Sequence, residues 1–301
     1  MKKVLAAWLC IAGFSGAVKA QLLWRVTPPV TQKTSFLFGT MHLAGFSYFE
    51  KHPAPLDSLK QCSRVITEAE MSDRGAMFTM FRYAAMPEGV RLSDSLTRRQ
   101  WHRLDSLLQK GDPPVSASVY ENYKPALAES VASIKMFGDV YKDLVKDDAV
   151  PMDQGIDDFA YKSGFTRDYL ETAESQFELM FVKPSLSLQF RSLRRLLNGD
   201  EDSAMQVYVS RSLKLPEYYE KQATDSIAQI IDLAVTGDAE ELAWNRQFLE
   251  ERNSLWLKKL QTVLETERCF VAVGAAHLMR EDGLVASFRR LGYRVSPVVY
   301  K

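Results

Sequence analysis

Histidine and cysteine are scarce in this 301-residue sequence, which contains four histidines and three cysteines. Cys10 lies in an N-terminal apolar run, which leaves Cys62 and Cys269 for the rest of the chain. Two thiolates cannot by themselves form a cysteine-rich zinc site. Each of these two cysteines comes just before a predicted strand, so either a disulfide bond or two buried thiols fits their positions.

Neither sign of charge is in excess, because 38 Lys and Arg residues balance 38 Asp and Glu residues. This balance gives no general attraction for nucleic acid or for an anionic membrane surface. Common catalytic signatures are also missing: there is no G-x-S-x-G elbow, no HExxH helix, no Walker loop and no Rossmann glycine fingerprint. Any chemistry must therefore come from isolated polar residues. We expect a peptide or small-molecule substrate and no nucleic acid.

Long apolar runs are absent too, and only the first residues approach one. Lys2 and Lys3 precede an apolar stretch from Val4 to Phe14, and small residues follow as far as Ala20. This layout is typical of a secretory signal peptide and is too short for a good membrane span. We therefore expect residues 1–20 to be a signal peptide and the protein to be exported, either periplasmic or secreted, with no transmembrane segment after cleavage.

Hydrophobic residues make up 46% of the chain, enough to bury a sizeable core. Short β-prone runs occur near both ends and once in the middle, at 22–26, 35–39, 64–70, 166–170, 270–273 and 293–299. Helical spacing of apolar residues fills about 77–150 and 175–260. The sequence predicts one α/β domain over 21–301, with a mixed central sheet built from both chain ends and a large central helical insertion covering its working edge.

Two matched stretches stand out. Phe36–Leu43 and Cys269–Leu278 each run from an apolar strand into Gly-x-x-His-Leu, which places His42 and His277 at strand ends. In each frame the glycine lets the chain turn sharply off the strand. The other two histidines, His52 and His102, are expected on the surface.

Carboxylates occupy comparable positions. Glu68 lies at the end of the third predicted strand, and Glu171 follows the strand at 166–170. Ligand sites of open α/β sheets gather at the carboxyl ends of the strands. His42, His277 and Glu68 form a plausible divalent-metal set that leaves positions open for water and substrate. A strand-end histidine is also often a hydrogen-bonded structural residue, and that interpretation stays open.

At this point the chain resembles the TraB/GumN family, which is related to the Tiki proteins. The resemblance extends through most of the sequence after the predicted signal peptide and rests on the order and spacing of several short motifs. These motifs are Leu23–Val26, Phe38–His42, Val65–Glu70, Tyr123–Pro125, Gly155–Asp157, Leu170–Thr172 with Gln176, Glu251–Asn253 with Trp256, and Val273–Leu278 with Gly283–Leu284 and Gly292–Tyr293.

The resemblance implies a compact α/β fold akin to the erythromycin esterase-like and haem-binding ChaN-like proteins. Tiki proteins are described as metal-dependent proteases that use two GxxH motifs and a glutamate. Two departures affect the expected site. The family usually continues its second GxxHL with Pro-Gly, whereas this chain has Met279-Arg280-Glu281. Asp153-Gln154 also replaces a more usual glutamate-containing lead into Gly-Ile-Asp.

These patterns predict a metal-dependent hydrolase, with a peptidase as the first expectation. His42 and His277 would bind Mn²⁺, Co²⁺ or Zn²⁺, and Glu68 would be a ligand or a general base. Arg252 would stabilise a developing oxyanion, and Glu171 would orient a histidine. Two alternatives remain: a non-catalytic protein that binds a peptide signal or haem in the same cleft, and a metal-free esterase with histidine as its base.

Overall fold

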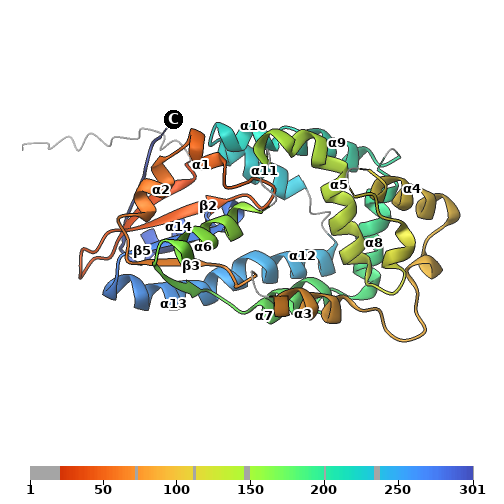
Figure 1. Cartoon of the computed structure of the whole chain (residues 1–301), viewed down its shortest axis with the longest axis horizontal. Helices are drawn as coiled ribbons and strands as arrows, with labels where there is room; N and C mark the ends of the chain where they lie inside the picture. The colour runs from red at the N-terminus through yellow and green to blue at the C-terminus, as the bar shows by residue number, and fades with distance from the viewer. Residues whose placement is uncertain are drawn as a thin grey trace, which may run out of the picture.

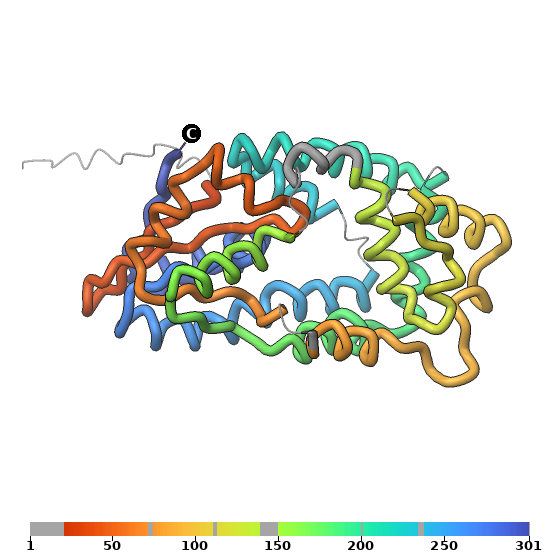
Figure 2. Tube along the Cα trace, in the orientation of Figure 1, coloured from red at the N-terminus to blue at the C-terminus, as the bar shows by residue number. Residues whose placement is uncertain are grey.

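The computed structural model describes residues 21–71, 74–110, 113–145, 150–199, 201–233 and 238–300. The predicted signal peptide at 1–20 lies outside these residues. Figure 1 shows a sheet with its covering helices at one end of the molecule and a group of helices at the other. The first and last described segments lie together at the sheet end, as the red and dark blue parts of the tube in Figure 2 show.

The described chain forms a six-stranded sheet in the order β4-β3-β5-β2-β1-β6. Strands β2 to β5 run parallel to one another, whereas β1 pairs antiparallel with β2 and with β6. The strands are β1 (Leu23–Thr27), β2 (Ser35–Thr40), β3 (Arg64–Thr67), β4 (Thr166–Tyr169), β5 (Cys269–Gly274) and β6 (Arg294–Pro297). The predicted α/β fold with a mixed sheet is therefore confirmed.

Strands β2 and β5 are central because both of their faces are apolar. Phe36 and Phe38 of β2 belong to one buried cluster, and Leu37 belongs to the cluster on the opposite face. Phe270 and Val271 of β5 divide between the two clusters in the same way. Successive side chains of a strand point to opposite faces, so a continuous apolar run is what a strand covered on both sides requires.

Helices cover both faces of the sheet. The first face carries α1 (Tyr48–Lys51), α2 (Ala54–Leu59) and α6 (Met152–Lys162), joined by α10 (Leu215–Glu220) and α11 (Thr224–Leu233). The second face carries α13 (Arg252–Thr266) and α14 (Leu284–Arg290). Trp256, Leu260 and Phe288 are buried against that second face. The sheet is thus the middle of three layers.

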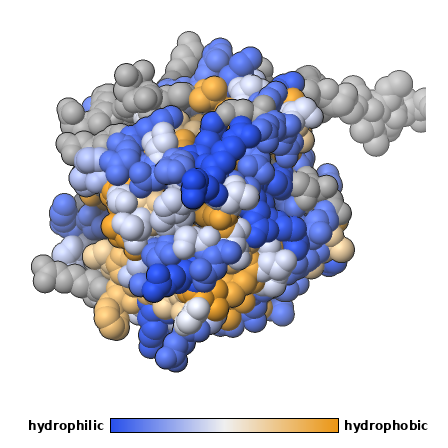
Figure 3. Space-filling view, turned by 90° about the vertical axis from the view of Figure 1, so that its right-hand side faces the viewer, coloured by the Kyte–Doolittle hydropathy of each residue, from blue (hydrophilic) through white to orange (hydrophobic). Residues whose placement is uncertain are grey.

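The remaining helices lie beyond the edge where the parallel strands end (Figure 1). They are α3 (Arg74–Ala84), α4 (Arg98–Leu108), α5 (Pro125–Val145), α7 (Ala173–Phe181), α8 (Leu186–Leu197), α9 (Ser203–Ser212) and α12 (Ala239–Arg246), with the short turns η1 (Leu92–Ser95) and η2 (Ala117–Tyr120). Helices α4, α5 and α8 share an apolar core of their own around Leu104, Ala128 and Leu193. Figure 3 faces this end, where hydrophilic side chains cover most of the surface.

Local signals explain where these helices begin. Thr97 accepts a hydrogen bond from the Gln100 backbone N–H at 3.2 Å, and the Gln100 side chain accepts from the Thr97 N–H at 2.9 Å. This reciprocal pair is a capping box, which satisfies two N–H groups that the first turn leaves unpaired. The side chains of Thr172, Ser185 and Asp202 also cap helices.

Several details differ from the sequence-based predictions. The predicted strand at 166–170 is present as β4, but it joins the same sheet, which therefore includes one strand from the middle of the chain besides those from its ends. His52 was expected on the surface, but it is buried and its Nε2 lies 2.7 Å from Glu220 Oε2. Cys62 and Cys269 are free buried thiols in the clusters on opposite faces of the sheet. None of the helices in the described ranges has the length and apolar character needed to cross a membrane.

Candidate active site at the carboxyl ends of the parallel strands

Four polar side chains follow the carboxyl ends of the four parallel strands. His42 comes after β2, Glu68 after β3, Glu171 after β4, and His277 lies in the turn η4 (Ala275–His277) that follows β5. Parallel strands end at the same edge of a sheet, and that edge is where ligands bind in open α/β folds. The structure therefore brings the sequence-predicted residues to one edge, in the order Glu171, Glu68, His277, His42.

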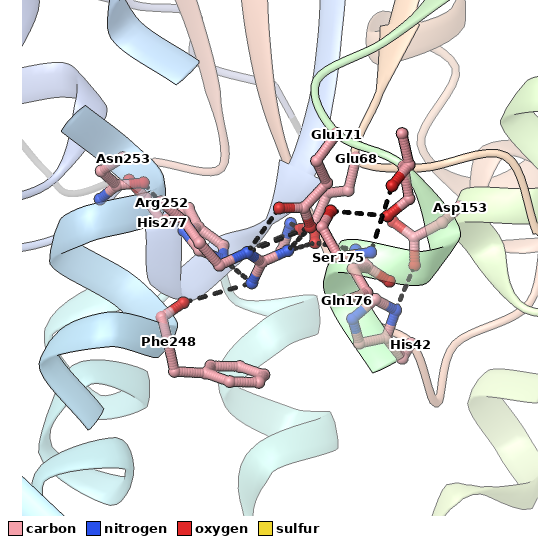
Figure 4. Close-up of polar contacts among 12 residues, drawn as sticks. His42, Glu68, Asp153, Glu171, Ser175, Gln176, Phe248, Arg252, Asn253 and His277 are labelled. Atoms are coloured by element: carbon pink, nitrogen blue, oxygen red, sulfur yellow. Dashed lines mark hydrogen bonds and ion pairs between the residues drawn. The ribbon is translucent and has the colours of Figure 1, made fainter. Parts of the chain in front are cut away.

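Arg252 joins this group from α13, where it is the first residue and is buried. Its Nη2 donates to Glu68 Oε2 at 2.6 Å and to Glu171 Oε1 at 2.5 Å, and its Nε donates to Glu171 Oε1 at 3.1 Å. Its Nη1 donates to the Phe248 carbonyl at 3.2 Å and lies 3.0 Å from His277 Nε2 (Figure 4). These contacts use all five N–H groups of the guanidinium. Arg252 thus holds its neighbours in place.

Glu68 is a buried carboxylate with several donors around it. Its Oε1 accepts the Gly274 backbone N–H at 2.7 Å, and its Oε2 accepts from Arg252 and from Gln176 Nε2 at 3.2 Å. Burial opposes ionisation, but the charge of Arg252 and the hydrogen bond from the Gly274 N–H outweigh it and hold the pKa of Glu68 well below its ordinary range. Glu68 therefore stays ionised at every ordinary pH.

Hydrogen-bond accounting fixes the tautomer of His277. Asn253 Nδ2 donates to the backbone carbonyls of His277, at 3.3 Å, and Asp282, at 3.2 Å, so Asn253 Oδ1 is the acceptor that faces the imidazole. His277 Nδ1 lies 2.8 Å from that oxygen and must carry the proton, which leaves the lone pair on Nε2. Burial lowers the pKa of His277 to about 4, although Glu68 opposes the shift. The ring is therefore neutral at pH 7.

His42 differs from His277 in both its exposure and its pKa. Its Nδ1 lies 2.5 Å from Asp153 Oδ2, in the first turn of α6, and its side chain is 69% exposed because it opens onto a cavity. The Asp153 carboxylate raises the pKa of His42 to about 9. Figure 4 draws this pair beside Gln176, on the other side of Glu68 from Asn253. The ring nitrogen Nε2 is the atom left for exchange with a bound molecule.

A cavity of about 420 Å³ connects these groups. Its polar lining includes His42, Glu68, Arg252 and His277. Its walls are largely apolar and come from α7, α10, α11 and the π-helical turn η3 (Gln247–Glu251), with Met180, Leu215, Ile227, Ile230, Phe248 and Leu249 among them. A concave apolar cavity with a few convergent polar groups is the usual form of a small-molecule site.

The sequence matches a known protein family over most of its length. The model of the TraB/PrgY/gumN family matches residues 22–297, which is nearly the whole chain. The chain belongs to the TraB/PrgY/gumN family. No curated protein and no solved structure matches it.

The side chains predicted to bind a metal in this TraB/PrgY/gumN member are His42, His277 and Glu68. Glu68 Oε1 lies 3.9 Å from His277 Nε2, but the Arg252 guanidinium contacts both side chains. Within the described ranges, no group of three His, Cys, Asp or Glu side chains is arranged to hold a metal ion. The residues, as arranged in this structure, therefore do not fit a three-ligand metal site.

Sequence reasoning missed three partners in this TraB/PrgY/gumN site. Asp153 pairs with His42, Asn253 orients His277, and Gln176 donates to Glu68. All three residues lie in sequence motifs that either match the family pattern or depart from it. No local sequence signal predicted which side chain each of them would contact. Glu171 was expected to orient a histidine, and it instead accepts hydrogen bonds from Arg252.

Proposed function

We propose that this protein is a hydrolase that cleaves peptide or small-molecule substrates in the 420 Å³ cavity. The observation that supports this is the convergence of a histidine–carboxylate pair, an ionised glutamate and a neutral histidine on one apolar-walled cavity. Perturbed titratable groups in a cleft are typical of catalytic sites. The His42–Asp153 pair is the acid–base component of the proposal.

His42 Nε2 faces the cavity while Asp153 holds Nδ1, which is how a general base is oriented. In its neutral form the ring takes a proton from a water molecule, and the water oxygen attacks the substrate carbonyl carbon. The bond from that carbon to the leaving nitrogen or oxygen then breaks, and His42 returns the proton to the leaving atom. Glu68 can orient the water by accepting its second hydrogen.

Arg252 acts in this proposal as a positioning residue. The sequence-based prediction gave it an oxyanion-stabilising role, but its five N–H groups are all taken by acceptors within the protein. Its charge offsets the carboxylates of Glu68 and Glu171, and its Nη1 sits against His277 Nε2. Removing it would disturb three side chains of the site together.

Metal dependence, which the sequence predicted, remains a second candidate form of this hydrolase. The observation in its favour is that Glu68 Oε1 lies 3.9 Å from His277 Nε2, although Arg252 Nη1 donates to that nitrogen in this structure. The two forms differ in their response to chelation. Activity that survives exhaustive chelation would favour the His42–Asp153 pair acting alone, whereas activity restored only by Mn²⁺, Co²⁺ or Zn²⁺ would favour the metal form.

The decisive experiment is a peptide-mixture digest followed by mass spectrometry, run with and without chelator. Wild type, His42→Ala and the surface variant His102→Ala should be compared. We expect new cleavage products with wild type and with His102→Ala and none with His42→Ala. No products under any metal condition would overturn the hydrolase proposal. Tight binding of a peptide or of haem without turnover would then favour the non-catalytic alternative.

A further inference from the structure

A second, smaller cavity adjoins the proposed catalytic groups. It measures about 200 Å³, and His42, Glu68 and Gln176 line both it and the larger cavity. The lining of the small cavity differs in kind, because Thr67, Asp153 and Asp157 contribute oxygen atoms and no Lys or Arg is among its described lining residues. A substrate that reaches both cavities would therefore have its central part beside His42.

Two oxygen atoms of residues that line this small cavity have no hydrogen-bond partner among the described residues. Thr67 is 3% exposed and its Oγ1 is unpaired, and the buried Oδ1 of Asp153 is also unpaired. Asp157 differs, since Arg167 Nη1 donates to its Oδ2 at 2.7 Å and the Tyr169 hydroxyl donates to its Oδ1 at 3.3 Å. A buried polar atom without a hydrogen bond is costly, so such atoms in a cavity wall indicate a bound donor.

We propose that the small cavity binds a primary ammonium group of the substrate. An ammonium has three N–H donors and no acceptor, which matches the unpaired oxygens of Thr67 and Asp153. Arg167 offsets the charge of Asp157. The negative charge of Asp153 is not offset when His42 is in the neutral form that the proposed base requires, and this charge favours a cation over a neutral donor and disfavours an anion. This inference rests on the proposed hydrolase function only in treating the ligand as a substrate.

The size and position of the small cavity determine which part of a substrate it can hold. A cavity of about 200 Å³ is below the size that holds a drug-sized ligand, so it admits a small end of a molecule. The bond beside His42 is then close to the amino end of the substrate. The site selects peptides or amides with a free amino terminus and discriminates against those whose terminus is blocked.

An equilibrium binding experiment tests the ammonium site without turnover. The probes are 2-phenylethylamine and 2-phenylethanol, which are similar in size and contain no bond that a hydrolase could cut. We expect wild type to bind the amine about tenfold more tightly than the alcohol, the difference of one charge-assisted hydrogen bond. Thr67→Val should bring the two affinities together, and Thr67→Ser should restore the preference.

Thr40→Val is the matched control. Thr40 is 2% exposed and stands at the end of the parallel strand β2, and its Oγ1 also has no partner among the described residues. It lines only the larger of these two cavities. This variant should keep the preference for the amine. Equal affinity of wild type for the two probes, or a preference that Thr67→Val leaves unchanged, would overturn the inference.

The same proteins, assayed with a free and an N-acetylated peptide of one sequence, separate this inference from the hydrolase proposal. A preference for the amine without any hydrolysis refutes the proposed function and keeps the ammonium site. Equal hydrolysis of the free and the acetylated peptide keeps the proposed function and refutes the ammonium site.

Discussion

At the scale of single residues, the two strand-end histidines show how neighbours decide the chemistry of identical side chains. The sequence presents His42 and His277 in the same Gly-x-x-His-Leu frame. In the structure, Asp153 raises the pKa of His42 to about 9, whereas burial lowers the pKa of His277 to about 4. One ring is therefore charged at pH 7 and the other is neutral. The repeat predicted that both would reach the same edge of the sheet, but their charges depend on partners more than 20 residues away.

The pKa of His42 gives a prediction for the pH dependence of hydrolysis. A general base works when deprotonated, so kcat/KM should rise with pH and level off above about 9. Asp153→Asn removes the charge that raises the pKa, so the midpoint should move down toward the ordinary value of about 6.5. A pH–rate series on both proteins measures this shift. An unmoved midpoint in Asp153→Asn would show that another group titrates.

Arg252 gives a stability prediction at the same scale. Arg252→Ala leaves the buried carboxylates of Glu68 and Glu171 without their cation, and the free energy of unfolding should fall by about 3–5 kcal/mol. Arg191→Ala removes a surface cation that pairs with Asp238 and Glu240, and it should cost much less, because ion pairs in water contribute little to stability. Urea denaturation of the two variants measures the difference. Equal losses would mean that the buried network is not a major source of stability.

At the scale of elements, apolar runs predicted the strands well because burial on both faces leaves a continuous signal. The ends of β2, β4 and β5 fall within two residues of their predicted positions, whereas β3 ends at Thr67, three residues before its predicted end. The start of α13 was harder, because the π-helical turn η3 leads directly into it and nothing local marks where Arg252 begins a new helix. The π-helical turn belongs to the cavity wall, where such irregular turns are often found.

The altered loop after η4 gives a prediction about this element. The family pattern has glycine where this chain has Arg280, and Arg280 adopts a positive φ of 67°. It also forms a 2.7 Å ion pair with Asp232. Both Arg280→Ala and Arg280→Gly lose that pair, but only glycine adopts the positive φ without strain. Arg280→Gly should therefore be about 1 kcal/mol more stable than Arg280→Ala in thermal or urea unfolding.

Gly283, three residues after Arg280 in the same loop, is required for a different reason. A Cβ on Gly283 would lie 2.1 Å from the Met279 carbonyl oxygen, so glycine is required there for space rather than for a positive φ. If Arg280→Gly and Arg280→Ala proved equally stable, the ion pair or the loop packing would outweigh the backbone conformation.

At the scale of the whole molecule, composition and periodicity predicted the α/β class and the helical section at the sheet edge. They predicted a strand at 166–170 but could not predict that it pairs with β3, because its polar, partly exposed residues do not indicate a neighbour. They also could not decide the state of the cysteines. Cys62 lies two residues before β3 and Cys269 is the first residue of the neighbouring strand β5, and the two thiols are buried in the clusters on opposite faces of the sheet.

The reactivity of the two buried thiols depends on whether the whole protein is folded. Burial raises the pKa of Cys62 and of Cys269 to about 12, so neither is a reactive thiolate in the native protein. We expect both to resist iodoacetamide under native conditions and to react together once the protein unfolds. Peptide mapping by mass spectrometry, with denaturant as the variable, measures this. Rapid native labelling of either cysteine would contradict the buried positions.

The position of β5 in the sheet has a consequence for the order of folding. This strand sits between β2 and β3, yet it enters the chain more than 200 residues after them. During synthesis, β2 can pair with β1, and β3 can pair with β4, but the edges of β2 and β3 that bind β5 stay unpaired until the last tenth or so of the chain is made. Any chain that ends before Cys269 lacks the central strand together with His277. The central sheet and the candidate site are therefore completed in the same late step, and a truncated product should behave as an aggregation-prone chain rather than as a folded protein with an incomplete site.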